Sequence, residues 1–310
     1  MTVTTSQNRR PRLSEPASSP GAQLRALLAL PEPTLVMGAH DGLSARIAAE
    51  AGFPALWASG LCMSTALGVR DSDEASWTEL LGLVARVVEA AGLPVLVDGD
   101  TGYGNFNTAR RFATQAERIG AAGVCLEDKV FPKMNSFVGD GHVLAPVDEF
   151  CGKIAACRDA LRDPDFVIVA RTEALIAGAG LHEALHRAEA YCAAGADAIF
   201  IHSRKPTVAE IAEFARAWDG RLPLLIAPTT YHATPLEEFA RLGLSGVIWA
   251  NQSMRAAVAA MKHACESLFE EGPVSLEPTI ASLDEVFSLM RYQDLADDEK
   301  RYAAPPESRA

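Results

Sequence analysis

The chain has 310 residues, of which 49% are hydrophobic and 22% are charged, and its formal net charge is -12. This composition is typical of a globular protein with a sizeable core. The negative charge argues against nucleic-acid binding, which needs a basic surface, and no apolar run approaches the roughly 20 residues of a membrane span. The charge does not exclude a small anionic substrate, because a local basic cluster or a metal ion can override it.

The cysteines and the chain ends indicate a cytoplasmic protein with short tails. The six cysteines show no Cys-x-x-Cys spacing, and several stand in apolar runs such as Val124-Cys125-Leu126, so we interpret them as reduced. The N-terminus lacks the apolar core of a signal peptide. Residues 1–20 are rich in Ser, Pro and Arg and are predicted to be disordered. We predict one domain over residues 21–295 and a flexible tail over 296–310.

Short apolar runs alternate along the chain with longer segments of helical character. Eight strands are predicted, at Thr34–Ala39, Ala55–Ala58, Pro94–Val97, Gly123–Leu126, Phe166–Ala170, Ala198–Ile201, Leu222–Ala227 and Val247–Ala250. The predicted helices that follow or separate them are Leu43–Ala51, Trp77–Ala91, Thr108–Gly120, Asp148–Leu161, Leu181–Ala194, Val208–Trp218, Pro235–Leu242 and Ser253–Phe269.

Eight strand–helix units predict an α/β fold, a (β/α)8 TIM-type barrel, with a doubly wound open sheet as the alternative. The strands are short and almost wholly apolar, as expected for a parallel sheet that is buried on both faces. A further helix is predicted at Leu283–Tyr292, after a break rich in Pro and Ser. Because it exceeds the eight units, we expect it to pack on a neighbouring subunit.

Acidic side chains stand at the ends of two neighbouring strands. The run Pro94–Val97 leads into Asp98-Gly99-Asp100, and Gly123–Leu126 leads into Glu127. The carboxyl ends of parallel strands meet at one rim of a barrel, so these acids should lie together. Carboxylates gathered at one point repel one another unless a cation is present, and the group predicts a site for a hard divalent ion.

Polar or aromatic residues follow the other strands, or lie in loops beside them. The remaining candidates are Trp57, Ser59, Gly60, Leu61, Asp71, Lys133, Asn135, Ser136, Arg171 and His202. Each candidate also has a structural interpretation. The acids could cap helices, Arg171 could form a structural ion pair, and His202 could be a neutral hydrogen-bonding residue. Ser59-Gly60-Leu61 could be a plain turn, and the loop from Lys133 to Ser136 could be solvated.

The chain resembles the isocitrate lyase/phosphoenolpyruvate mutase superfamily over residues 25–295. The runs that carry the resemblance include Gly38-Ala-His-Asp-Gly-Leu-Ser-Ala-Arg46, Leu67-Gly-Val-Arg-Asp-Ser72, Asp98-Gly-Asp-Thr-Gly-Tyr-Gly-Asn-Phe-Asn107, Glu127-Asp-Lys-Val-Phe-Pro-Lys-Met-Asn-Ser136 and Val247-Ile-Trp-Ala-Asn251. They occur in the order and at the spacing typical of the superfamily. The resemblance implies the barrel fold and an enzyme.

One loop distinguishes the branches of this superfamily. Its lyases carry a Lys-x-Cys-Gly-His loop whose Cys is the acid/base for carbon–carbon cleavage, whereas the same loop here reads Lys133-Met134-Asn135-Ser136. The missing Cys argues against the lyases and the carboxyphosphonoenolpyruvate mutase branch. Phosphonopyruvate hydrolase typically has Thr where Asn135 stands, so Asn135 favours the mutase branch. The hydrolase stays the alternative, and an inactive barrel with a binding role is a third, less favoured hypothesis.

The resemblance implies that the enzyme interconverts phosphoenolpyruvate and phosphonopyruvate, the reaction that opens phosphonate biosynthesis, with Mg2+. Asp98 would bind the ion directly, and Asp71, Asp100 and Glu127 would hold its waters. Whether Asp71 also accepts the phosphoryl group as a nucleophile is left open.

The resemblance also implies roles for the other candidates, a homotetramer that exchanges the extra C-terminal helix, and coupling to a phosphonopyruvate decarboxylase in the pathway. Trp57 would form a wall of the pocket. The implied ligands of the pyruvyl end are Ser59, Gly60 and Leu61, and those of the phosphoryl group are Asn135, Ser136, Arg171 and His202. Lys133 would belong to the loop that closes and excludes water.

Overall fold

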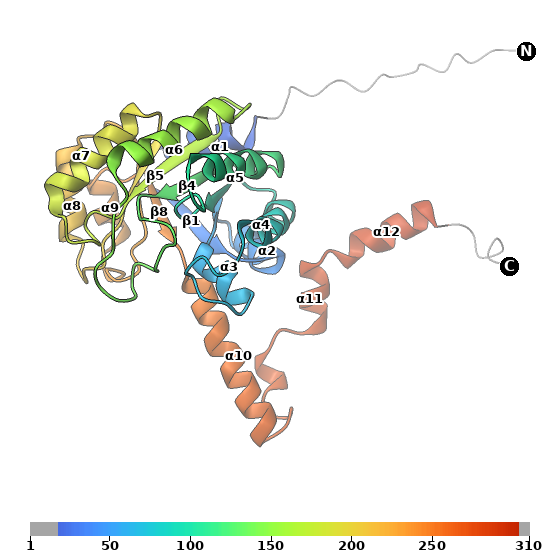
Figure 1. Cartoon of the computed structure of the whole chain (residues 1–310). Helices are drawn as coiled ribbons and strands as arrows, with labels where there is room; N and C mark the ends of the chain where they lie inside the picture. The colour runs from blue at the N-terminus through green and yellow to red at the C-terminus, as the bar shows by residue number, and fades with distance from the viewer. Residues whose placement is uncertain (1–17, 304–310) are drawn as a thin grey trace, which may run out of the picture.

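The computed structural model describes residues 18–303 and contains a closed barrel of eight parallel strands (Figure 1). Each strand pairs with the next along the chain, and the last pairs with the first. The strands are β1 (Thr34–Ala39), β2 (Ala55–Ala58), β3 (Val95–Asp98), β4 (Gly123–Glu127), β5 (Val167–Thr172), β6 (Ala198–Ile201), β7 (Leu224–Ile226) and β8 (Gly246–Trp249). The predicted barrel is confirmed, and the open-sheet alternative is wrong.

Helices surround the barrel and connect successive strands. They are α2 (Gly42–Glu50), α3 (Gly60–Ala66), α4 (Trp77–Ala91), α5 (Phe106–Arg118), α6 (Val147–Ala160), α7 (Gly180–Ala193), α8 (Ala209–Trp218) and α9 (Leu236–Arg241). Helix α4 shows how local sequence sets their limits. Ser76 and Glu79 form a capping box at its start, and Gly92 ends it in the left-handed conformation, with φ of 62°.

Helix α1 (Pro20–Leu28) precedes the first strand and was not predicted. Ser19 caps it and Pro20 occupies its first turn, a favourable position for Pro. Leu24 and Leu28 are buried in the cluster of side chains that fills the barrel interior. The predicted disordered tail of residues 1–20 therefore overlaps the start of a helix at Pro20, and residues 1–17 lie outside the described part of the chain.

The side chains inside the barrel alternate along each strand with those that face the helices. The interior cluster includes Trp57 on β2, Leu96 on β3, Cys125 on β4 and Phe200 on β6. Side chains two residues apart on a strand point the same way. The residues two positions further on therefore continue the interior at the carboxyl rim, and they are Ser59, Asp98, Glu127 and His202.

The last helices leave the barrel. In Figure 1, α10 (Gln252–Glu270) runs outward from the barrel, and the chain then turns back through α11 (Leu283–Leu289) and α12 (Tyr292–Tyr302). Side chains of this arm are exposed, among them Phe269 at 92% and Leu283 at 71%. The helix predicted at Leu283–Tyr292 is present as α11, but it ends at Leu289.

Helix α12 occupies residues 296–302 of the segment 296–310 that is predicted as a flexible tail. It has ion pairs one turn apart, between Arg291 and Asp294 and between Lys300 and Asp297. Such pairs stabilise a helix, which explains why this polar segment is ordered as α12. Residues 304–310 lie outside the described part. Among residues 18–303, no helix has the length and apolar character that a membrane crossing requires.

Candidate active site

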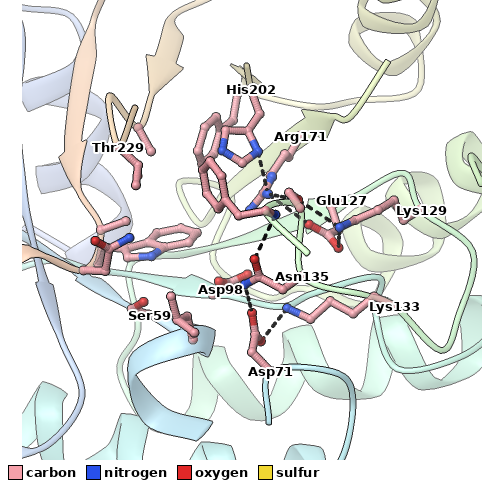
Figure 2. Close-up of a pocket in the computed structure, with 18 residues that line it drawn as sticks. Ser59, Asp71, Asp98, Glu127, Lys129, Lys133, Asn135, Arg171, His202 and Thr229 are labelled. Carbon is pink, nitrogen blue, oxygen red and sulfur yellow. Dashed lines mark hydrogen bonds and ion pairs between the residues drawn. The ribbon is translucent and has the colours of Figure 1, made fainter. Parts of the chain in front are cut away.

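One pocket at the carboxyl rim contains nearly all the predicted site residues (Figure 2). Those that line it are Trp57, Ser59, Leu61, Asp71, Asp98, Glu127, Lys133, Asn135, Ser136, Arg171 and His202. Gly60 and Asp100 lie directly behind this lining. They contact it through hydrogen bonds to Asp98, from the Gly60 N–H to Oδ2 at 3.1 Å and from the Asp100 N–H to Oδ1 at 3.3 Å.

The acids lie at the ends of β3 and β4, as predicted, and none of them is the N-cap residue of the helix that follows its strand. Asp98 and Glu127 are the last residues of their strands, and the following helices begin later, at Phe106 and Val147. Asp98, Asp100 and Glu127 are all buried. The interpretation of these acids as N-caps of the following helices is therefore wrong, although Asp98 accepts a hydrogen bond from the first N–H of α3.

Gly60 is required by the close approach of α3 to the acids. A Cβ atom at this position would lie 2.9 Å from Asp98 Oδ2 and 3.2 Å from Asp100 Oδ1. Ser59 is the residue that caps α3, so the interpretation of Ser59-Gly60-Leu61 as a plain turn is wrong. In this structure the Gly60 N–H donates to Asp98, so its predicted bond to the substrate stays a prediction.

The loop between β4 and α6 reaches over the pocket and holds the acids. Lys133 Nζ lies 2.7 Å from Asp71 Oδ1, and Asn135 Nδ2 donates to Asp71 Oδ2 at 2.6 Å (Figure 2). Lys133 Nζ also lies 2.5 Å from Asp100 Oδ1. Burial alone would raise the pKa of the Asp71 carboxyl, but Lys133 and Asn135 hold it below its usual value. These loop residues are thus part of the site rather than a solvated surface.

Glu173 is the centre of a second cluster, which includes Arg171 and His202. Its carboxylate is fully buried and accepts from Arg171 Nε at 2.5 Å, and it lies 2.8 Å from His202 Nδ1. Arg171 Nη2 lies 2.8 Å from the same nitrogen. Burial opposes ionisation, yet Arg171 and His202 hold the pKa of Glu173 well below its usual range. His202 Nδ1 thus lies between a carboxylate, which only accepts hydrogen bonds, and a guanidinium N–H, which only donates, so one tautomer satisfies only one of the two contacts.

Burial and then the charge of Arg171 lower the pKa of His202, so the imidazole is neutral at neutral pH. Arg171 also lies 3.3 Å from Glu127 and 5.1 Å above the ring of Phe200. The structural interpretations of Arg171 and His202 are therefore partly confirmed, since both take part in buried polar contacts. Both also face the pocket.

Some residues of the site were not predicted to have a role. Lys129 stands in the run from Glu127 to Ser136, and Glu173 follows Arg171 by two residues, but neither is assigned a role from the sequence. The alternation of side chains along β5 could have indicated Glu173. Residues two positions apart on a strand point to the same side, so Glu173 continues the series of Val167, Val169 and Arg171. Phe137, Thr229 and Asn251 also line the pocket. Phe137 covers His202 edge-to-face, with the ring centroids 5.4 Å apart.

The charges of this rim fit a divalent cation. The buried acids are Asp71, Asp98, Asp100, Glu127 and Glu173, and the cations among them are Lys129, Lys133 and Arg171. If all of them are ionised, these five acids and three cations have a net charge of -2. Burial, against the attraction of Lys133, raises the pKa of Asp100 well above its usual range, and Asp98 and Asp71 raise it further. A bound cation would favour the ionised forms.

The donor atoms also fit Mg2+. Asp100 Oδ1 and Glu127 Oε1 are buried and accept no hydrogen bond from the residues described, although a lysine ammonium lies near each. In residues 18–303, no three His, Cys, Asp or Glu side chains converge closely enough to hold a metal by themselves. Mg2+ usually takes one or two carboxylates, several waters and substrate oxygens. The arrangement therefore fits one direct carboxylate, with the others acting through water.

The contact between Gly60 and Asp98 gives a testable prediction. Gly60→Ala should weaken magnesium binding by about 10- to 100-fold, because the new methyl group displaces the Asp98 carboxylate. Calorimetric titration with Mg2+ measures this. Gly82→Ala is the matched control, since Gly82 lies exposed on α4 with open space around its Cβ position. Equal affinities in the two variants would contradict the assignment of Asp98.

Comparison with known proteins identifies the family. Residues 24–269 match the family model for phosphoenolpyruvate phosphomutase. The chain is 64% identical over 291 residues to phosphoenolpyruvate phosphomutase of Streptomyces hygroscopicus, an alignment that covers 93% of each chain.

Two crystal structures resemble the fold over nearly their full length. One is phosphoenolpyruvate phosphomutase from Streptomyces platensis subsp. rosaceus, with a TM-score of 0.90, 43% identity and coverage of 92% of this chain and 99% of that one. The other is phosphonopyruvate hydrolase in complex with oxalate and Mg2+, with a TM-score of 0.87, 36% identity and coverage of 93% and 100%. The chain belongs to the phosphoenolpyruvate mutase family of the isocitrate lyase/phosphoenolpyruvate mutase superfamily.

Proposed function

We propose that this enzyme is an isomerase that interconverts phosphoenolpyruvate and phosphonopyruvate by moving a phosphoryl group between the enol oxygen and C3. The observation that carries the proposal is the closed pocket with a carboxylate cluster on one side and Arg171 and His202 on the other. The high identity to a phosphoenolpyruvate phosphomutase supports it. In the direction from phosphonopyruvate, the C3–P bond breaks and an O–P bond forms, so no other reactant is needed.

We propose Mg2+ as the cofactor, held directly by Asp98 and through water by Asp71, Asp100 and Glu127. When bound, the ion supplies positive charge that stabilises the enolate oxygen of the pyruvyl group. The solved hydrolase complex, which contains oxalate and Mg2+, supports this assignment. Ser59 and Leu61 would bind the carboxylate end of the substrate, beside Asp98, and Trp57 would pack against its plane.

The other side of the pocket would bind the phosphoryl group. The transition state of phosphoryl transfer is loose, and its charge lies on the three peripheral oxygens. The enzyme therefore mainly positions the phosphoryl group and neutralises this charge. Arg171 is fixed by Glu127 and Glu173 and presents a planar fork of donors suited to such oxygens. His202 and Asn135 would complete the contacts. We propose that Asp71, paired with Lys133, holds a water of the metal rather than acting as a nucleophile, because a metaphosphate-like group needs no covalent adduct with the enzyme.

Exclusion of water would separate this reaction from hydrolysis. The phosphoryl group is transferred as a reactive, metaphosphate-like species, which water would convert to phosphate. Asn135 and Phe137 lie on the loop that covers the pocket, and Phe137 contacts the ring of His202. Asn135 would distinguish the chain from the hydrolase branch. The higher sequence identity to a phosphoenolpyruvate phosphomutase, 64% against 38% to a phosphonopyruvate hydrolase, supports the mutase.

Phosphorus NMR of the purified enzyme with phosphonopyruvate and Mg2+ tests this function. We expect a phosphoenolpyruvate signal with little inorganic phosphate, and loss of turnover when Mg2+ is removed by a chelator and its return on readdition. Inorganic phosphate formed together with pyruvate would instead establish the hydrolase. Turnover that is insensitive to chelation would contradict the role of the metal.

We also propose a homotetramer in which neighbouring subunits exchange the C-terminal arm formed by α10, α11 and α12. Large apolar side chains are exposed on this arm, including Val274 at 84% and Leu283 at 71%, and an apolar surface of this kind usually meets a partner. A phosphonopyruvate decarboxylase in the same pathway would draw the product away. The free cysteines support a cytoplasmic location.

A truncation tests the arm. A chain ending at Glu271 lacks α11 and α12 and should have a lower mass in light scattering than the full-length tetramer, because the exchanged contacts are gone. A chain ending at Ala303 is the control and should keep the tetramer mass. A tetramer that survives the longer truncation would contradict the exchange of α11 and α12.

A further inference from the structure

The Ser136 hydroxyl uses all of its hydrogen-bonding capacity within the protein. It donates to Glu173 Oε2 at 2.6 Å, and it accepts from Lys129 Nζ at 2.9 Å and from Arg171 Nη2 at 3.0 Å. A hydroxyl has one proton and two lone pairs, so no position is left for a substrate oxygen. The side chain is also buried. Ser136 therefore differs from Asn135, which is only partly buried and keeps its amide at the pocket.

Glu173 lies behind the pocket wall and does not line it. Its two oxygens have different partners, because Oε1 is bonded to Arg171 and faces His202, whereas Oε2 is bonded to Ser136. One carboxylate thus joins two residues of the barrel to one residue of the covering loop. Its own backbone is fixed as well, since the Glu173 N–H donates to Asp128 Oδ1 at 2.7 Å.

Lys129 completes this junction from the start of the loop. Its ammonium donates to the Met134 carbonyl at 2.6 Å and to Ser136, and it lies 3.2 Å from Glu127 and 3.7 Å from Glu173. The side chain is buried. Hydrogen bonds to charged groups contribute more than neutral ones, and in a buried place water cannot replace them cheaply. The contacts of Ser136 therefore hold the loop at the side of Glu173, while Lys133 and Asn135 hold it at the side of Asp71.

We infer that Ser136 is a latch rather than a phosphoryl ligand: Glu173 and Lys129, as positioning residues, hold its hydroxyl and keep the loop from Lys129 to Leu144 closed over the pocket. Closure by this latch keeps water away from the phosphoryl group. Arg171 is bonded to both Glu173 and Ser136, so the closed loop and the phosphoryl-binding side of the pocket are aligned together. The role of the latch in keeping water from the phosphoryl group rests on the proposed mutase reaction.

An outer ion pair on the same loop offers a matched control. Arg204 Nη2 lies 2.8 Å from Asp140 Oδ1, and the Asp140 side chain is 89% exposed. Exposed pairs contribute little to stability. Asp140→Asn therefore changes a carboxylate of this loop without touching the latch.

Limited trypsin digestion without substrate tests the latch. The cleavage sites after Lys129 and Lys133 are protected because both side chains are buried. Cleavage of a locally opened segment follows the population of the open form. Ser136→Ala and Glu173→Gln should each speed cleavage at these two sites by about tenfold or more, as expected for the loss of a charge-assisted hydrogen bond. Asp140→Asn should stay close to wild type.

A thermal melt shows that each variant is folded, and Ser136→Ala, which removes only one oxygen, decides the result if Glu173→Gln does not fold. The double variant should be cleaved no faster than about the faster single variant, because both changes break the same contact. Wild-type cleavage rates in Ser136→Ala would overturn the latch, as would an equal acceleration in Asp140→Asn.

Product analysis tests whether the latch keeps water away from the phosphoryl group. With phosphonopyruvate, both latch variants should release a larger fraction of inorganic phosphate relative to phosphoenolpyruvate than wild type and Asp140→Asn do. Faster cleavage with an unchanged phosphate fraction would overturn the role in water exclusion. If wild type itself releases only phosphate, the mutase proposal fails, while the digestion still decides whether Ser136 is the latch.

Discussion

The balance of buried charge in one layer of side chains determines the rest of this site. The interior of the barrel is apolar up to Trp57, Cys125 and Phe200, and the next inward positions carry acids and bases. Ionised groups beside such an interior must be paired, because water does not compensate them. Lys133 pairs with Asp71 and Asp100, and Lys129 and Arg171 pair with Glu127. Among the residues described, Asp98 has no ion pair with a lysine or arginine, so the pairing is incomplete without a cation. Arg171 comes from β5, and the two lysines come from the covering loop.

This pairing couples the position of the loop to the chemistry. Lys133 and Asn135 contact Asp71 on the metal side, whereas Ser136 contacts Glu173 on the phosphoryl side. The loop therefore connects both halves of the pocket when it is closed. Positioning with little covalent participation suits phosphoryl transfer, and the same closed loop would protect the reactive group from water. In this account the loop determines whether the product is an isomer or phosphate.

Much of the fold could be predicted because its signals are local. The strands are short apolar runs, and glycines such as Gly92 mark the ends of helices. Helix α1 was missed because it lies next to a polar tail, and its function, to fill the end of the barrel with Leu24, depends on residues far away in the sequence. Helix α12 was missed because its ion pairs were not weighed against its polar composition.

The metal-side residues could be predicted because Asp98 and Glu127 directly follow apolar strands. Glu173 lies two residues after Arg171, so its side chain faces the same side of the sheet and could have been identified. A motif made of pocket-lining residues, however, does not indicate the residues that support the lining. The partners of the Ser136 hydroxyl could not be predicted, since Lys129, Glu173 and Arg171 meet there only through the packing of β4 and β5. A loop sequence shows which groups are present, whereas the number of their free hydrogen-bonding positions requires the structure.

The central claim is that the phosphoryl group never leaves the closed pocket, and a crossover experiment tests it most directly. Phosphonopyruvate labelled with both 18O in the phosphonate and 13C in the pyruvyl part is mixed with unlabelled phosphonopyruvate, and the phosphoenolpyruvate formed is analysed by mass spectrometry. The account predicts only doubly labelled and unlabelled product. Singly labelled molecules, or 18O-labelled inorganic phosphate as the main product, would contradict it.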